Sequence, residues 1–197
     1  MNEPEPLRVV AATLRHFDCS YSKYVENPVE LGQVVVVREG DSVVYGVVAE
    51  LESGPEDPTR PLQPIGRAEE SAADVMRAHP HIRQLLRTRV RVITCGHGED
   101  GAIRPYLPPV PPPLLARVEP ASEEEVRELV AGGHFLAQLL AAPDCDDAVA
   151  GAALRRAMRA FHTAEQAHAF AVEAGKELAR ILRAEPARLT TILRAAT

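Results

Sequence analysis

Short apolar runs separated by turn-forming residues fill the first half of the chain, which is the pattern of β-strands. Four consecutive valines, Val34 to Val37, leave no polar face, so this strand is expected to be buried on both sides, as in a closed barrel. Glu39-Gly40-Asp41 predicts a hairpin to the next run, and Gly46 lies where that second strand must bend. The expected strands cover residues 7–14, 16–22, 33–38, 43–51, 88–94 and 102–106.

Prolines interrupt this pattern at two places. Residues 53–66 form a proline-punctuated loop, and short helices are expected after it at about 68–78 and 80–86. A second cluster lies in Leu107 to Leu114, where proline fixes φ and removes amide donors. Residues 107–113 are therefore expected to form an extended strap outside the sheet, and 115–118 to pair briefly after it.

From Ala121 onward the apolar residues follow helical spacing. Ser122 with Glu125, and Thr163 with Gln166, have the spacing of capping boxes. The pair Gly132-Gly133 either breaks the first helix or permits close packing. The sequence thus predicts an α+β fold: a small closed β-barrel of about six strands with a short helical insertion in residues 1–120, then an α-helical domain of about four helices in residues 121–197.

The composition of the chain argues against several functional classes. The 197 residues carry a net charge of −6, which disfavours a dominant nucleic-acid surface. Three widely spaced cysteines form no C-x-x-C pair, and the acidic segment Met1 to Pro6 lacks the apolar core of a leader peptide. No apolar run approaches the length of a membrane span. A cytoplasmic protein without a membrane segment is expected.

The β-stranded half resembles the HAS barrel, the domain named for HerA and ATP synthase. The resemblance rests on Gly32 to Leu51, the strand Arg89 to Cys95, and the passage of the strap into Leu115-Ala-Arg-Val118. It covers roughly residues 5–120. In HerA-type helicases this barrel precedes a hexameric motor ATPase, and a related barrel crowns the rotary ATP synthases. The resemblance implies no catalytic residue here, because the family's catalytic residues lie in the motor domain.

The sequence contains no phosphate-binding loop. The single Gly-Lys pair, Gly175-Lys176, is followed by Glu177 where the motif requires Ser or Thr, and Phe170 stands where its first glycine should be. No nucleophile elbow and no paired-carboxylate signal stands out either. A non-enzymatic protein without a cofactor is therefore expected.

Two groups of residues are candidates for binding. Cys95, His97 and Glu99 lie in one turn-like segment and include metal-ligating side chains, although a structural zinc site needs a fourth ligand. The densest basic cluster has two members on a helix and two on one strand face, a spacing suited to phosphates, with Glu69, Glu70 and Asp74 as the acidic residues expected to balance it. Its members are Arg83, Arg87, Arg89 and Arg91.

The helical tail offers a third candidate surface. Its apolar stripe must be buried against the same chain or against a partner. The residues singled out for a partner interface are Ala171, Ala174, Leu178 and Ile181.

Three functions remain open from the sequence. The preferred one is a non-enzymatic assembly or adaptor protein that, by the resemblance, docks on a hexameric ATPase or a nuclease, in DNA processing; self-association into a homo-oligomer is compatible with it. The second is a nucleic-acid-binding accessory protein that uses the arginine cluster. The third is a small metalloprotein centred on Cys95.

Overall fold

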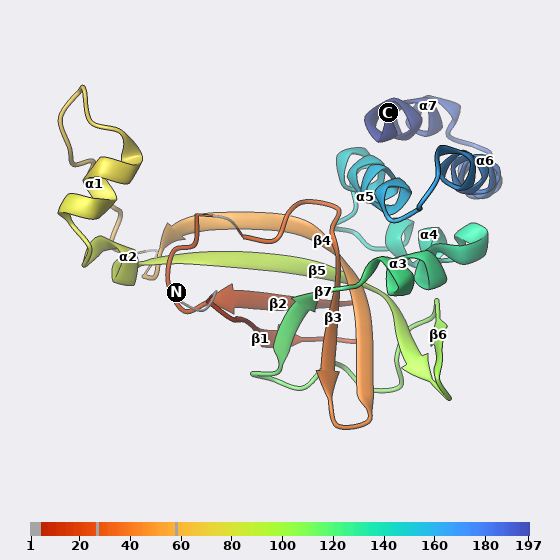
Figure 1. Cartoon of the computed structure of the whole chain (residues 1–197), viewed down its shortest axis with the longest axis horizontal. Helices are drawn as coiled ribbons and strands as arrows, with labels where there is room; N and C mark the ends of the chain where they lie inside the picture. Colours follow the sequence, from red (N-terminus) through yellow and green to blue (C-terminus); the bar gives the residue numbers. More distant parts are fainter. Residues whose placement is uncertain (1–4, 27, 58) are drawn as a thin grey trace.

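The chain has an α+β fold in which six antiparallel strands close into a barrel and the helices follow (Figure 1). The computed structural model describes residues 5–26, 28–57 and 59–197, so most of the acidic N-terminal segment considered above lies outside the described residues. The barrel order is β2-β1-β7-β3-β4-β5, and a β2–β5 pairing closes it. The strands are β1 (Leu7–Ala12), β2 (His16–Tyr21), β3 (Val34–Glu39), β4 (Ser42–Pro55), β5 (Leu86–Glu99) and β7 (Arg117–Pro120). The short β6 (Ala102–Arg104) pairs with β5 beyond the ring.

Strand β3 is buried on both faces, as predicted, and the reason is its position between two hydrophobic clusters. Val35 and Val37 face the barrel interior, where they join an inner cluster that includes Phe17. Val34 and Val36 face outward and join an outer cluster formed with the helices. Closure of the barrel accounts for only one of the two buried faces; the helices account for the other.

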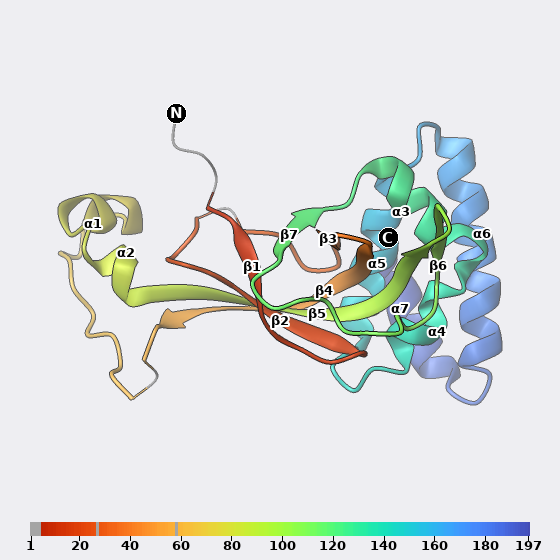
Figure 2. The same cartoon turned by 90° about the horizontal axis from the view of Figure 1, so that it is seen from below.

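The helices pack on the outer face of the barrel around β3, β4 and β5. The bounds are α3 (Glu123–Val130), α4 (Phe135–Leu140), α5 (Asp147–Arg159), α6 (Ala164–Ile181) and α7 (Pro186–Ala196), with one 3₁₀ turn at Ala131–Gly133. Figures 1 and 2 show them gathered at one end of the molecule. Positive φ angles at Gly132 and Gly133 separate α3 from α4, so these glycines break the expected helix. Both expected capping residues, Ser122 and Thr163, accept hydrogen bonds from the first turns of their helices.

The long strands β4 and β5 bend at two irregularities of their pairing. One falls between Tyr45 and Gly46, as the sequence predicted, and the other between Val48 and Glu50. A Cβ atom on Gly46 would lie 2.4 Å from Cγ1 of Val92, so only glycine fits there. The strand expected over residues 88–94 is longer than predicted: β5 continues to Glu99, and the turn before β6 consists of the two residues after it.

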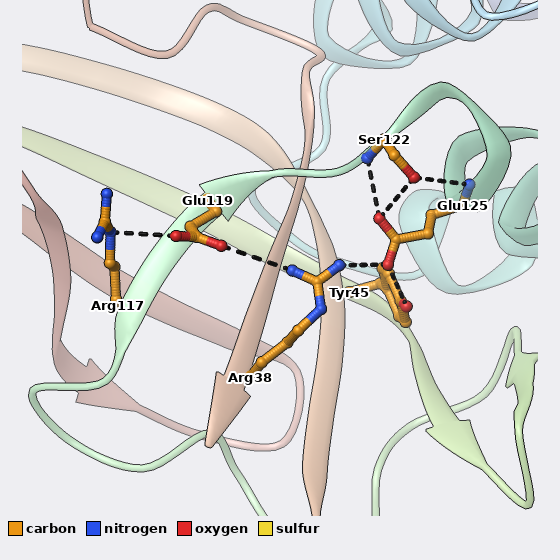
Figure 3. Close-up of polar contacts among 6 residues, drawn as sticks. All are labelled: Arg38, Tyr45, Arg117, Glu119, Ser122 and Glu125. Carbon is orange, nitrogen blue, oxygen red and sulfur yellow. Dashed lines mark hydrogen bonds and ion pairs between the residues drawn. The ribbon is translucent and has the colours of Figure 1, made fainter. Parts of the chain in front are cut away.

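A polar network joins the barrel to the first helix at the chain junction (Figure 3). Glu125 of α3 accepts hydrogen bonds from the backbone N–H of Ser122 at 2.9 Å and from the Tyr45 hydroxyl of β4 at 2.8 Å, and it pairs with Arg38 of β3. Arg38 also lies 3.7 Å from Glu119 of β7, which pairs with Arg117. The capping box of α3 is thus bonded to two barrel strands.

The pKa of Glu125 reflects this network. Burial alone would raise it, but the hydrogen bonds from Ser122, Tyr45 and Arg38 outweigh burial and lower the pKa to about 2. Burial, followed by the bond to Glu125, raises the pKa of Tyr45, so the phenol remains a donor. Ionised Glu125 therefore stabilises the folded chain.

We expect this stabilisation to disappear in acid. The pKa of Glu125 in the folded chain lies below its ordinary value of 4.5, so the contribution is complete above about pH 4.5 and is lost between pH 4.5 and about pH 2. Glu125→Gln should lower the free energy of unfolding by about 1.5–3 kcal/mol at pH 7, and by much less at pH 2, where about half of the folded chains carry a protonated Glu125. Urea unfolding of both proteins at the two pH values checks this; equal differences at both would contradict it.

Gly32 sets the approach between the barrel and α5. Its φ is +75°, and an added Cβ would lie 2.4 Å from the carbonyl carbon of Ala152. We expect Gly32→Ala to lower the free energy of unfolding by about 2–4 kcal/mol, because strain and overlap add. Gly40 also has a positive φ, +57°, but has open space around it, so Gly40→Ala should cost only about 1 kcal/mol. Equal losses in thermal or urea unfolding would show that the close approach to α5 is unimportant.

Candidate interaction surface

The hairpin of β4 and β5 extends beyond the last β2–β5 pair, Ser20 with Arg89, and forms an arm, residues 53–88 (Figure 1). Strand β3 pairs with β4 only as far as Val47, whereas β4 and β5 remain paired out to Pro55 and Leu86. The tip of the arm, residues 56–85, carries α1 (Ala72–Ala78) and α2 (Ile82–Leu85). Figures 1 and 2 agree that the tip lies at the opposite end of the molecule from the tail helices.

The tip is locally ordered but contributes little to the core. Ser71 caps α1 in a capping box with Asp74, and Asp74 accepts a bond from Arg77 at 2.7 Å. Helix α1 buries no residue, and Ile82 is the one buried side chain among the described residues of the tip. The large side chains of Leu62, Ile65 and Leu85 are about half exposed.

The base of the tip is attached to the barrel by backbone bonds. The N–H of Glu56 donates to the Leu85 carbonyl at 2.8 Å and closes the hairpin. The N–H of Tyr24 donates to the Arg83 carbonyl at 3.3 Å, and the Arg83 side chain pairs with Glu26. These bonds fix the orientation of the arm relative to the barrel, and the apolar side chains of the tip stay exposed to solvent.

The tip of the arm has the properties expected of a surface that binds another molecule. A segment that buries one side chain gains little hydrophobic stabilisation in return for the entropy lost on ordering it. Contact with a partner would bury the exposed Leu62, Ile65 and Leu85 and add the hydrophobic stabilisation that the tip lacks within the chain. The expected strands, 43–51 and 88–94, do not include the arm, because the paired part of the hairpin continues to Pro55 and Leu86. The alternation of Leu86, Thr88 and Val90, all buried, was the available signal.

The four arginines of the predicted basic cluster lie along the arm and the adjoining barrel face, and each is paired with a carboxylate. Arg83 pairs with Glu26, Arg87 with Glu56 at 2.8 Å, and Arg89 lies 3.7 Å from Glu52. Arg91 binds Asp18 at 2.8 Å and lies 3.7 Å from Asp144, and the bond to Asp18 raises its pKa.

The balancing acids are not the ones expected. Asp74 instead pairs with Arg77 of its own helix, and Glu70 accepts a bond from the backbone of Arg67. The carboxylates that meet the arginines come from neighbouring strands and from segments distant in the sequence. A groove of about 500 Å³ beside Arg87, Arg89 and Arg91 is also lined by Glu50, Glu52 and Glu56. Its surface carries both charges and is not a basic track for phosphates.

The predicted metal ligands do not converge. The Cys95 thiol is fully buried in the outer cluster, and burial raises its pKa, which disfavours the thiolate that a metal requires. His97 contacts the Tyr106 carbonyl through Nδ1 at 3.2 Å, and Glu99 lies 3.6 Å from Arg104. Within residues 5–26, 28–57 and 59–197, no three His, Cys, Asp or Glu side chains gather as a metal site.

The residues expected to bind a partner through the tail pack within the chain instead. Ala174 and Leu178 are fully buried in the outer cluster, and Ile181 packs against it. Ala171 is half-buried on the same helix, α6. The stripe on α6 is therefore occupied by the chain's own helices, and the arm replaces it as the candidate surface.

No protein-family model and no curated protein matches the chain. In the part of the chain that the structure describes, none of the helices has the length and apolar character that crossing a bilayer requires.

The pairing of the arginines predicts weak binding of nucleic acid. We expect a 20-base-pair duplex at about 150 mM salt to bind more weakly than about 10⁻⁴ M, the weak end of non-specific protein–DNA affinity. Fluorescence anisotropy with a labelled duplex measures this. The control replaces Arg155 and Arg159, two exposed arginines of α5, with serine. The nucleic-acid hypothesis would be restored if binding were tighter and fell steeply with salt. The binding should then be lost in Arg89→Ser/Arg91→Ser and kept in the control.

Proposed function

We propose that this chain is a non-enzymatic assembly or adaptor protein that uses the tip of its arm to contact a partner. The observation that carries the proposal is the combination of a directed arm with a tip that buries a single described side chain. The apolar residues Leu62, Ile65 and Leu85 are the centre of the proposed contact, and the surrounding charges of both signs form its rim.

The proposed partner is a hexameric ATPase or a nuclease that acts in DNA processing. This choice rests on the resemblance to the HAS barrel, and the closed six-stranded barrel is compatible with it. The sequence carries no phosphate-binding loop of its own, so the ATPase activity would belong to the partner. The helices cover one side of the barrel and leave the arm free to reach a neighbour.

Affinity purification followed by mass spectrometry tests the proposal. The tagged chain should recover a ring ATPase or a nuclease from lysate of the source cells. Replacing residues 56–85 with Asn-Gly should reduce the recovery at least tenfold, because Pro55 and Leu86 face each other in register and a two-residue turn can join them without the tip. The barrel should remain folded, since the deletion removes one buried side chain.

Point variants separate loss of the surface from loss of the fold. Leu62→Glu/Leu85→Glu places charges on the tip, whereas Val172→Glu/Leu193→Glu places them on similarly exposed positions of the tail helices. The tip variant should lose the partner and the tail variant should keep it, with thermal unfolding unchanged in both. Retention of the ATPase or nuclease by the tip-deleted chain would refute the role of the arm, and recovery of neither would refute the adaptor function.

A further inference from the structure

The proline-rich strap crosses one end of the barrel and presents an apolar face. It connects β6 to β7, and Figure 2, viewed from below, shows this connection passing across the barrel strands. Pro108 and Pro112 are buried toward the barrel. Four large side chains of the strap are exposed, and we term them together the strap face: Tyr106 (59% exposed), Val110 (57%), Leu114 (62%) and Leu115 (67%).

Leu115 is held in this exposed position by an unfavourable backbone conformation. Its φ is +66°, in the left-handed region that a branched side chain rarely adopts. Its N–H donates to the Val9 carbonyl at 2.8 Å, its carbonyl accepts from Arg8 at 2.8 Å, and the N–H of Ala116 donates to the Pro113 carbonyl at 3.3 Å. The chain thus maintains a strained turn that leaves a large apolar side chain in water, a combination typical of contact sites.

The two ends of the strap face carry opposite charges. Near Val110, a hollow of about 360 Å³ between the strap and two hairpins is lined by Asp41 and Glu99. Glu99 lies 3.6 Å from Arg104, so the net negative charge at this end comes from Asp41. Near Leu115, the exposed Arg8 donates a hydrogen bond to the Leu115 carbonyl. Arg117 follows two residues later but pairs with Glu119, so the net positive charge at this end comes from Arg8. The run from Pro105 to Ala116 between these ends contains no charged residue. At about 3.1 Å per residue, the extended chain from Val110 to Leu115 spans roughly 15 Å.

We infer that the strap face binds a second copy of this chain, with the two straps antiparallel across a two-fold axis. Residues near such an axis meet their own copies, so an uncharged centre avoids like-charge repulsion. The same axis brings the acidic end of one strap opposite the basic end of the other. Tyr106, Val110, Leu114 and Leu115 of each copy then lose their exposure to water. Because the arm is not involved, this inference does not depend on the proposed adaptor function.

Two other modes of recognition fit the strap less well. Modules that bind polyproline helices need both prolines of a P-x-x-P pair, but each such pair here, 105 with 108, 108 with 111 and 109 with 112, has one buried member. Addition of a partner strand needs backbone donors, which the five prolines of residues 107–114 lack. The third mode of recognition is packing of apolar side chains against another apolar surface, which is typical of homodimer interfaces.

Sedimentation velocity of the full chain from about 1 to 200 µM tests the inference. We expect a monomer–dimer equilibrium with a dissociation constant of about 1–100 µM, the range of a small interface. Leu114→Glu, which places like charges at the centre, should raise the constant at least tenfold. Val172→Glu, a similar change at an exposed apolar position on α6, should leave it unchanged. A wild-type chain that stays monomeric at 200 µM, or a dimer that tolerates Leu114→Glu, would overturn the inference.

A charge exchange tests the antiparallel arrangement. Arg8→Glu and Asp41→Lys should each weaken the dimer, because each places like charges opposite one another, and the double variant should restore it. Local damage to the Leu115 turn by Arg8→Glu could not be repaired by a change at the other end of the strap, so rescue identifies the pairing between copies. Absence of rescue would overturn the arrangement. The chain without residues 56–85 should dimerise like the wild type, which separates this result from failure of the adaptor proposal.

Discussion

Burial of the barrel wall on both faces is the constraint from which the rest of the architecture follows. The valines of β3 alternate between the inner cluster of the barrel and the outer cluster shared with the helices. Neither face is polar, so a barrel without the helices would expose an apolar wall, and the amphipathic helices would have nowhere to bury their stripes. The two halves of the chain therefore stabilise each other through one shared cluster. The bonds of Glu125 and the close approach at Gly32 fix how they meet.

This mutual burial also decides where the chain can meet other molecules. The side of the barrel that faces the tail is covered, and the stripe on α6 is used within the chain. The surfaces that remain are the arm, which projects away from the helices, and the strap across one barrel end (Figures 1 and 2). Both consist of segments that hold exposed apolar side chains in a defined place. The fold thus separates its stabilising contacts from its candidate binding surfaces.

The distribution of charged residues also separates stabilising contacts from candidate binding surfaces. Each arginine of the basic cluster pairs with a carboxylate of a neighbouring strand or of a distant segment, so the positive charge of the cluster is neutralised within the chain. Exposed pairs of this kind contribute little stability singly, but they remove the positive potential that a nucleic-acid surface needs. At the strap, Asp41 lies near Val110 and Arg8 near Leu115, with only uncharged strap residues between them, an arrangement that favours contact with another molecule.

The sequence by itself determined the fold class, five of the six barrel strands, the helical second half and both helix N-caps, because these depend on local spacing and on side chains three residues apart. The sixth strand was assigned wrongly: residues 102–104 pair with β5 outside the ring, and β7 takes the place expected for them. The sequence also located the irregularity at Gly46, where a glycine interrupts an apolar strand. Only the tertiary structure decided which acids neutralise Arg89 and Arg91, that Cys95 and Leu178 are core residues, and that β4 and β5 extend into an arm. These outcomes depend on strand register and on packing between distant segments, which spacing along the chain does not specify.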